Sequence, residues 1–103
     1  MADPMRIRAV LVGDKVEVKI LMAHVMETGQ RKDADGNTVP AHYIVTVRAR
    51  CKDREVFSAD FGPSVSKNPF LAFRFKGAAK GDKLTITWTD TAGDSRSDET
   101  TIA

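Results

Sequence analysis

Apolar and polar residues alternate along several short stretches of this chain. Between residues 15 and 22, valine, isoleucine and methionine fall on one face, and lysines and a glutamate fall on the other. A period of two is typical of a half-buried antiparallel strand. Further strand-like stretches cover residues 6–12, 43–49, 56–61, 71–75, 84–88 and 95–102. Without any helical periodicity beside them, they predict an all-β fold, an immunoglobulin-like antiparallel β-sandwich of about seven strands.

Short turns separate these stretches. Glycine in Gly13-Asp14 permits a two-residue hairpin turn, and Lys52-Asp53 predicts a second hairpin. The polar last stretch is predicted to be an edge strand that its charges protect from aggregation. Trp88 offers a large apolar surface and is predicted to anchor the core. Because 103 residues is an ordinary length for one domain, residues 1–103 are expected to form a single domain.

The interval of residues 23–40 interrupts this regular spacing. A link of that length in a compact domain is usually functional or mobile. Within it, Asp35-Gly36-Asn37 predicts a tight turn, because glycine and asparagine tolerate a positive φ. The acidic residues resemble half of a calcium loop, but Ile44 stands where the bidentate glutamate would be needed, so we exclude a calcium site.

The segment from Gly62 to Phe70 contains two prolines between two predicted strands. Proline fixes φ and removes a backbone donor, so a stiff, irregular connection is expected. Ser64 and Ser66 lack a nucleophile-elbow motif and a nearby histidine, which argues against catalysis. Two interpretations remain open: a rigid structural corner and a recognition surface.

Charge and composition exclude some classes of partner. Lysine and arginine number 16 against 14 acidic residues, and the basic residues are scattered along the sequence. Together with an aromatic content of 7%, this argues against nucleic-acid binding. The apolar run of residues 9–12 is too short for a signal peptide, and no run is long enough to span a membrane. The residues alone therefore indicate a cytoplasmic protein, and its one cysteine agrees.

Two groups of residues are candidates for metal binding or thiol chemistry. Met22, His24 and Met26 alternate, so an extended chain would place two thioethers and an imidazole on one side, a donor set suited to Cu(I). Core packing explains the same residues. Cys51 lies between Arg50 and Lys52, which would favour its thiolate and a redox or sulfur-acceptor role. It has neither a C-x-x-C partner nor an adjacent histidine, so an inert cysteine is the competing interpretation.

Motifs along nearly the whole chain resemble the SoxZ family. The match includes residues 21–29, 31–33, 40–42, 62–70, 73–77, 81–82, 88–90 and 93–96. One difference is Val25, where that family typically has proline after the histidine.

This resemblance implies a non-catalytic subunit of the SoxYZ sulfur-carrier complex of thiosulfate oxidation. It implies a heterodimer with SoxY, whose C-terminal cysteine arm carries the sulfur intermediates, and transient contacts with the Sox enzymes that act on that arm. No cofactor is expected, and the residues themselves argue against a metal, nucleic-acid or membrane partner. Self-association is expected when SoxY is absent, because an uncovered apolar patch or sheet edge tends to pair with another copy. A periplasmic location would follow from export together with SoxY, because the chain shows no signal peptide of its own.

We expect partner contacts in two segments, from Met22 to Arg31 and from Gly62 to Phe70. Aromatic and methionine side chains supply contact area, and prolines reduce the entropy lost on binding. The predicted contact residues are Met22, His24, Met26, Arg31, Pro63, Val65, Lys67, Asn68 and Phe70.

Overall fold

The computed structural model describes residues 3–62 and 64–103, and its described residues form seven strands and no helix. The strands are β1 (Arg6–Val12), β2 (Lys15–Leu21), β3 (Ile44–Cys51), β4 (Arg54–Asp60), β5 (Phe70–Lys76), β6 (Lys83–Asp90) and β7 (Ser95–Thr101). Each coincides, within a few residues, with a stretch predicted from the sequence. Within the described ranges there is accordingly no helix that could cross a membrane.

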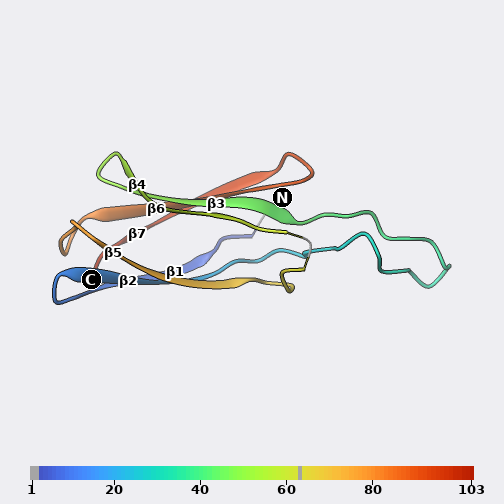
Figure 1. Cartoon of the computed structure of the whole chain (residues 1–103), viewed down its shortest axis with the longest axis horizontal. Helices are drawn as coiled ribbons and strands as arrows, with labels where there is room; N and C mark the ends of the chain where they lie inside the picture. Colours follow the sequence, from blue (N-terminus) through green and yellow to red (C-terminus); the bar gives the residue numbers. More distant parts are fainter. Residues whose placement is uncertain (1–2, 63) are drawn as a thin grey trace.

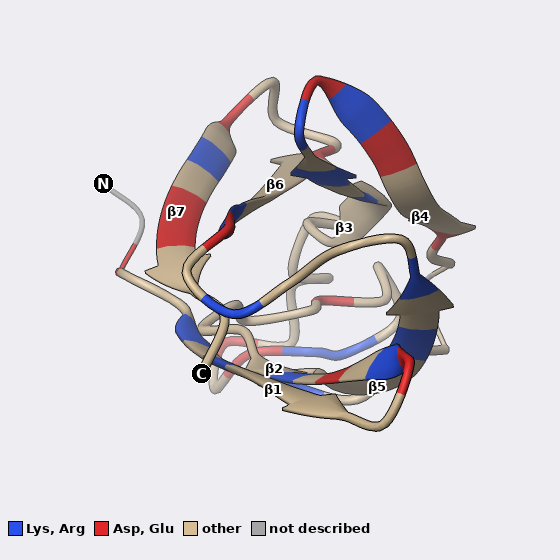
Figure 2. Ribbon diagram, turned by 90° about the vertical axis from the view of Figure 1, so that its left-hand side faces the viewer, with Lys and Arg blue, Asp and Glu red and all other residues tan. Residues whose placement is uncertain are grey.

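The strands form two antiparallel sheets packed face to face (Figures 1 and 2). One sheet has the order β1-β2-β5 and the other has the order β4-β3-β6-β7. The prediction of an antiparallel β-sandwich is confirmed. In a constant-type immunoglobulin domain the fourth strand extends the sheet of the first two strands. Here β4 pairs with β3 and extends the opposite sheet instead.

The core lies between the sheets and is built by the alternation seen in the sequence. In β2, Val16, Val18 and Ile20 are completely or almost completely buried. Trp88 in β6 is only 1% exposed, so its predicted role in the core is confirmed. A fully buried aromatic side chain of this size contributes several kcal/mol, on the order of 4, to folding.

The register of β3 differs from the prediction at its start. In the sequence, Tyr43 and Val45 alternate in phase with Val47 and Ala49, which predicts that they face inward, but the buried residue is Ile44, and Val45 is half-buried. The pairing of β3 with β6 is irregular between Ile44 and Thr46. An irregularity of this kind shifts the alternation by one residue, so side chains before it point to the opposite face.

The predicted turns are also present. Gly13 has a φ of 65°, and Lys52 and Asp53 both adopt positive φ between β3 and β4. β7 lies at the edge of its sheet, as its polar sequence predicted. The C-terminal residue closes one side of the sandwich, because Ala103 N–H donates to Ala9 O and Leu11 N–H donates to Ala103 O, both at 2.9 Å.

Residues 27–42 leave the sandwich as a two-stranded extension, which we call the ribbon (Figure 1). It is held by backbone bonds from Glu27 N–H to His42 O at 2.7 Å and from Val39 N–H to Arg31 O at 2.7 Å. The predicted turn is at its tip, where Gly36 has a φ of 81° and Asp33 accepts the N–H of Asn37. The ribbon makes the molecule elongated, with extents of 53 × 21 × 19 Å.

Candidate functional site at the base of the ribbon

Two histidines and an aspartate meet where the ribbon joins the sandwich. His24 follows β2, His42 precedes β3, and Asp90 ends β6. The Asp90 carboxylate oxygen Oδ2 lies 2.9 Å from His24 Nε2 and 2.8 Å from His42 Nε2. We call these three residues the His–Asp–His cluster. It ties both ends of the ribbon to the end of a central strand.

Asp90 is buried, and both of its carboxylate oxygens accept hydrogen bonds. Its Oδ1 accepts the backbone N–H groups of Ala92 and Asp94, each at 3.0 Å. Burial raises the pKa of the Asp90 carboxyl, but hydrogen bonds from His24, His42 and the backbone of the following turn outweigh it and leave the pKa below its ordinary value. Asp90 is therefore held as a carboxylate by donors from three segments of the chain.

The tautomer of His24 follows from its contacts. Its Nδ1 accepts the backbone N–H of Met26 at 3.1 Å, so the ring proton belongs on Nε2, which donates to Asp90. The ring also meets Trp88 edge to face, with centroids 5.1 Å apart, and meets His42 at 4.7 Å. His24 is thus fixed in position, orientation and tautomer.

The same three residues offer the donor set of a two-histidine, one-carboxylate metal site. A neutral histidine that binds a metal through Nε2 carries its proton on Nδ1. In His24 that nitrogen faces the N–H of Met26 and accepts from it. The geometry therefore fits a closed hydrogen-bond network better than a metal centre.

The segment before β5 is joined to the cluster through Asn68. Asn68 Oδ1 accepts the backbone N–H of His24 at 3.1 Å, and Asn68 N–H donates to His24 O at 2.9 Å. Asn68 has a φ of 52°, a left-handed conformation that asparagine tolerates better than most residues. The two segments that the sequence singled out as contact candidates thus lie side by side.

Replacing Asn68 with alanine should lower the free energy of unfolding by about 1–2 kcal/mol, because it removes the acceptor for His24 N–H and leaves a strained φ. Asn68→Asp keeps an oxygen at that position and tolerates the same φ, so its loss should be less than half as large. Urea unfolding of both variants measures this difference. Equal losses for the two variants would contradict a role for the Oδ1 bond.

A shallow cleft of about 350 Å³ opens beside the cluster. Its lining includes Ala23, His24, His42, Lys67, Asn68 and Asp94. One side chain of the cluster, that of His42, is 39% exposed. The cluster is therefore partly accessible from the end of the sandwich that carries the ribbon.

The comparison with known families accounts for nearly all of the chain. A family profile described as "Sulphur oxidation protein SoxZ" matches residues 5–101. The chain belongs to the SoxZ family. This membership confirms the resemblance seen in the motifs and assigns the chain to sulfur oxidation as a Sox subunit. A search of curated proteins gives no match.

Several solved structures share this fold at low sequence identity. A hypothetical protein from Pyrococcus horikoshii aligns with a TM-score of 0.67 at 17% identity, covering 99% of this chain and 88% of that one. A superoxide reductase in the oxidized state aligns at 0.66 and 17% identity, covering 99% and 89%. A superoxide reductase (neelaredoxin) variant from Archaeoglobus fulgidus aligns at 0.63 and 18%, covering 99% and 90%. At these identities the likeness shows the fold alone.

The predicted contact residues of this SoxZ-family chain fall into two groups. Met22, His24 and Met26 are 0%, 8% and 5% exposed, so the prediction that their side chains form a contact surface does not fit their burial. Their apolar parts belong to the core or support the cluster. The exposed or half-buried members are Arg31, Val65, Lys67, Asn68 and Phe70, and Pro63 lies outside the described residues.

The soft-metal hypothesis for Met22, His24 and Met26 is not supported by this geometry. It required an extended chain, but Met26 has a φ of 50°, which breaks the alternation. The Met26 sulfur accepts the N–H of Ile44 at 3.4 Å, and His24 Nδ1 is also occupied. The three candidate ligand atoms therefore have other partners or lie in the core.

The reactive-thiol hypothesis for Cys51 fails for a similar reason. Cys51 is only 2% exposed. Burial and the nearby Asp82 carboxylate raise the pKa of its thiol, and the cations Lys52 and Arg54 do not compensate. The burial of the thiol supports the competing interpretation of an inert cysteine, because the neighbouring charges in the sequence do not determine its pKa.

Sequence reasoning singled out His24 but gave no role to Asp90 or His42 at this site. The two are 48 residues apart, and only the return of β6 beside β3 brings them together. An isolated histidine before one predicted strand and an aspartate at the end of another were the signals available. Neither carries information about its distant partner.

Proposed function

We propose that this SoxZ-family chain is the non-catalytic subunit of the SoxYZ carrier complex in thiosulfate oxidation. The observation that carries the proposal is the state of its one cysteine. Cys51 is buried and its thiol pKa is raised, which disfavours the thiolate that sulfur chemistry requires. A sulfur-oxidation subunit without an available thiol needs a partner that supplies one, and SoxY has that role in the proposed complex.

The ribbon end of the molecule is the proposed SoxY-binding surface. Arg31, Lys67 and Asn68 are exposed there, and Val65 is half-buried. The His–Asp–His cluster and the Asn68 bonds fix the backbone beneath them. A preordered surface loses less entropy on binding, which favours a stable heterodimer.

The proposed location is the periplasm, reached by export together with SoxY. In an oxidising compartment an accessible cysteine would form mixed disulfides. The 2% exposure of Cys51 protects it from that reaction. Without SoxY, the uncovered ribbon-end surface, where the apolar Val25 is 49% exposed, would favour self-association.

Replacing Cys51 with alanine should leave the proposed function intact. The Cys51→Ala chain should co-purify with SoxY in equal amounts, and the complex reconstituted with the Sox enzymes should retain thiosulfate-dependent turnover within about twofold. The cost in folding stability should be about 1 kcal/mol, because only one sulfur atom is removed from the core. Mass spectrometry should find the sulfur adducts on SoxY alone.

The decisive contrary result is a loss of turnover while the heterodimer still assembles. A sulfur adduct on Cys51 in the unmodified complex would be equally damaging, because it would give this chain the acceptor role. Failure of the chain to bind SoxY at all would refute the pairing itself. Hydrogen exchange of the complex locates the contact, since the proposal requires protection at the ribbon end.

A further inference from the structure

The outward face of the β1-β2-β5 sheet collects positive charge. The pairing registers place Arg8 opposite Lys19, and Lys15 opposite Lys76. Because alternate residues share a face, the basic residues of three strands all point away from the core. The six basic residues on this face are Arg6, Arg8, Lys15, Lys19, Arg74 and Lys76.

Most of this charge has no acidic partner. Arg74 pairs with Glu17 at 3.6 Å and Lys76 pairs with Asp14 at 3.5 Å. For Arg6, Arg8, Lys15 and Lys19 the described residues provide no ion pair. Like charges opposite each other on neighbouring strands destabilise a sheet. This face keeps two such pairs, Arg8 opposite Lys19 and Lys15 opposite Lys76. Both lower the folding stability, so their presence needs an explanation other than folding.

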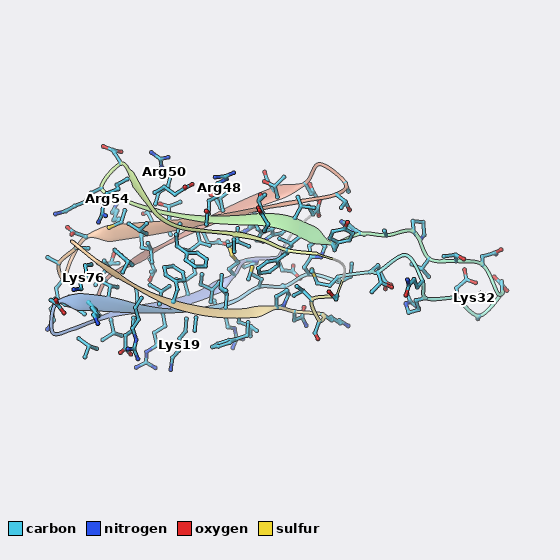
Figure 3. The ribbon with its side chains drawn as sticks, in the orientation of Figure 1. Lys19, Lys32, Arg48, Arg50, Arg54 and Lys76 are labelled. Carbon is cyan, nitrogen blue, oxygen red and sulfur yellow. The ribbon has the colours of Figure 1, made fainter. Side chains whose placement is uncertain are left out.

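The outward face of the other sheet differs in this respect. Two of its cations have carboxylate partners, with Arg48 and Glu55 3.0 Å apart and Lys83 and Glu99 3.6 Å apart, and Arg50 donates to the backbone O of Asp53 at 3.3 Å. Between them lie threonines and serines of β6 and β7. Figure 3 shows Arg48 and Arg50 on this side of the sandwich and Lys19 on the opposite side. The charge imbalance is therefore confined to one face.

An apolar depression lies at one end of the cationic face. Leu21 and Phe70 are paired across β2 and β5, and they are 41% and 63% exposed. The depression measures about 210 Å³. Its lining consists of Arg6, Ile7, Arg8, Lys19, Leu21 and Phe70.

We propose that this face binds a protein segment that carries aspartates or glutamates around one large apolar side chain. The cations would pair with the carboxylates, and the apolar side chain would enter the depression between Leu21 and Phe70. Interfaces of permanent complexes are depleted in charge at their centre, whereas charged faces accelerate encounters that salt weakens. The occupant is therefore a second, transient partner, and the inference does not depend on pairing with SoxY.

Other anions fit this face less well. Glu17 lies among the cations and would repel the continuous phosphates of a nucleic acid. An anionic membrane would pair with the cations but would leave the apolar depression without a specific occupant. An acidic segment with one apolar anchor uses both features at once.

Binding of a fluorescein-labelled peptide tests the proposal. The probe is a short synthetic peptide with one phenylalanine flanked on each side by aspartates and glutamates, and anisotropy is measured with the full chain at low salt. The double variant Arg8→Glu/Lys19→Glu should weaken binding at least about tenfold, because two attractions become repulsions. Raising NaCl to about 0.5 M should weaken it to a similar degree. A peptide with serine in place of phenylalanine should also bind more weakly.

The matched control is Lys32→Glu/Lys80→Glu, which changes the net charge equally at the ribbon tip and in the β5–β6 turn. Its effect should stay below about twofold. Equal effects of the two double variants, or no saturable binding of the peptide, would overturn the proposal. Tighter binding to a single-stranded oligonucleotide or to phosphatidylglycerol vesicles would replace the protein segment with that partner. Loss of peptide binding when SoxY is added would assign the face to SoxY and refute a second partner.

Discussion

Replacing Asp90 with alanine is expected to lower the free energy of unfolding by about 3 kcal/mol. The change leaves the Nε2–H groups of His24 and His42 and two backbone N–H groups without their acceptor. The melting temperature should fall by about 15 °C. Thermal and urea unfolding measure both quantities.

Asp60→Asn is a suitable control, because Asp60 is an exposed aspartate at the end of another strand. Its effect should stay within about 0.5 kcal/mol. Hydrogen exchange adds a local measurement. In Asp90→Ala the amides of Glu27 and His42, which bond across the base of the ribbon, should lose protection before those of β2 and β3. An Asp90→Ala chain as stable as the Asp60→Asn control would refute the structural role of the cluster.

Acid is expected to destabilise the protein through Asp90 and Asp98. Asp98 bonds Arg96 and accepts the N–H of Met5, and these contacts lower its pKa despite partial burial. Hydrogen bonds from the cluster outweigh burial and lower the pKa of Asp90. Both carboxyls then take up protons more readily in the unfolded chain, so stability rises with pH wherever they titrate.

The stabilisation from these groups is complete above their unfolded pKa of 3.8 and is lost as pH falls through their lower folded values. Urea unfolding between about pH 6 and pH 2 should therefore show a steep loss below about pH 4. Asp98→Asn should flatten this part of the profile, and Asp90→Asn should flatten it while lowering the whole curve. A profile with the same acid slope in all three proteins would show that other carboxyls control acid unfolding.

The strands were predictable because local patterns determine them. Alternation in residues 15–22 placed Val16, Val18 and Ile20 in the core, and glycine marked the turn at Gly13. The error at the start of β3 came from an irregular pairing with β6, which depends on the partner strand and leaves no trace in the local pattern. The family was predictable for a different reason, because many short motifs agreed along the chain.

The His–Asp–His cluster and the cationic face were not predictable from local patterns. Both depend on which strands become neighbours: β6 beside β3 for Asp90 and His42, and β1 beside β2 beside β5 for the six basic residues. Along the sequence those basic residues are scattered, and the sheet gathers them on one side. Burial was equally inaccessible, which is why the charges beside Cys51 suggested the alternative of a more acidic thiol than its position allows.

The ribbon separates two kinds of constraint on the sequence. At its base, a change at His24, His42 or Asp90 disturbs contacts among three strands and lowers the folding stability. At its tip, residues 30–38 are exposed and bond mostly to one another. Under the SoxY-binding role proposed for the ribbon, mutations there would alter partner recognition without altering the fold. With that role, partner specificity would be free to evolve in the ribbon while the sandwich stays fixed.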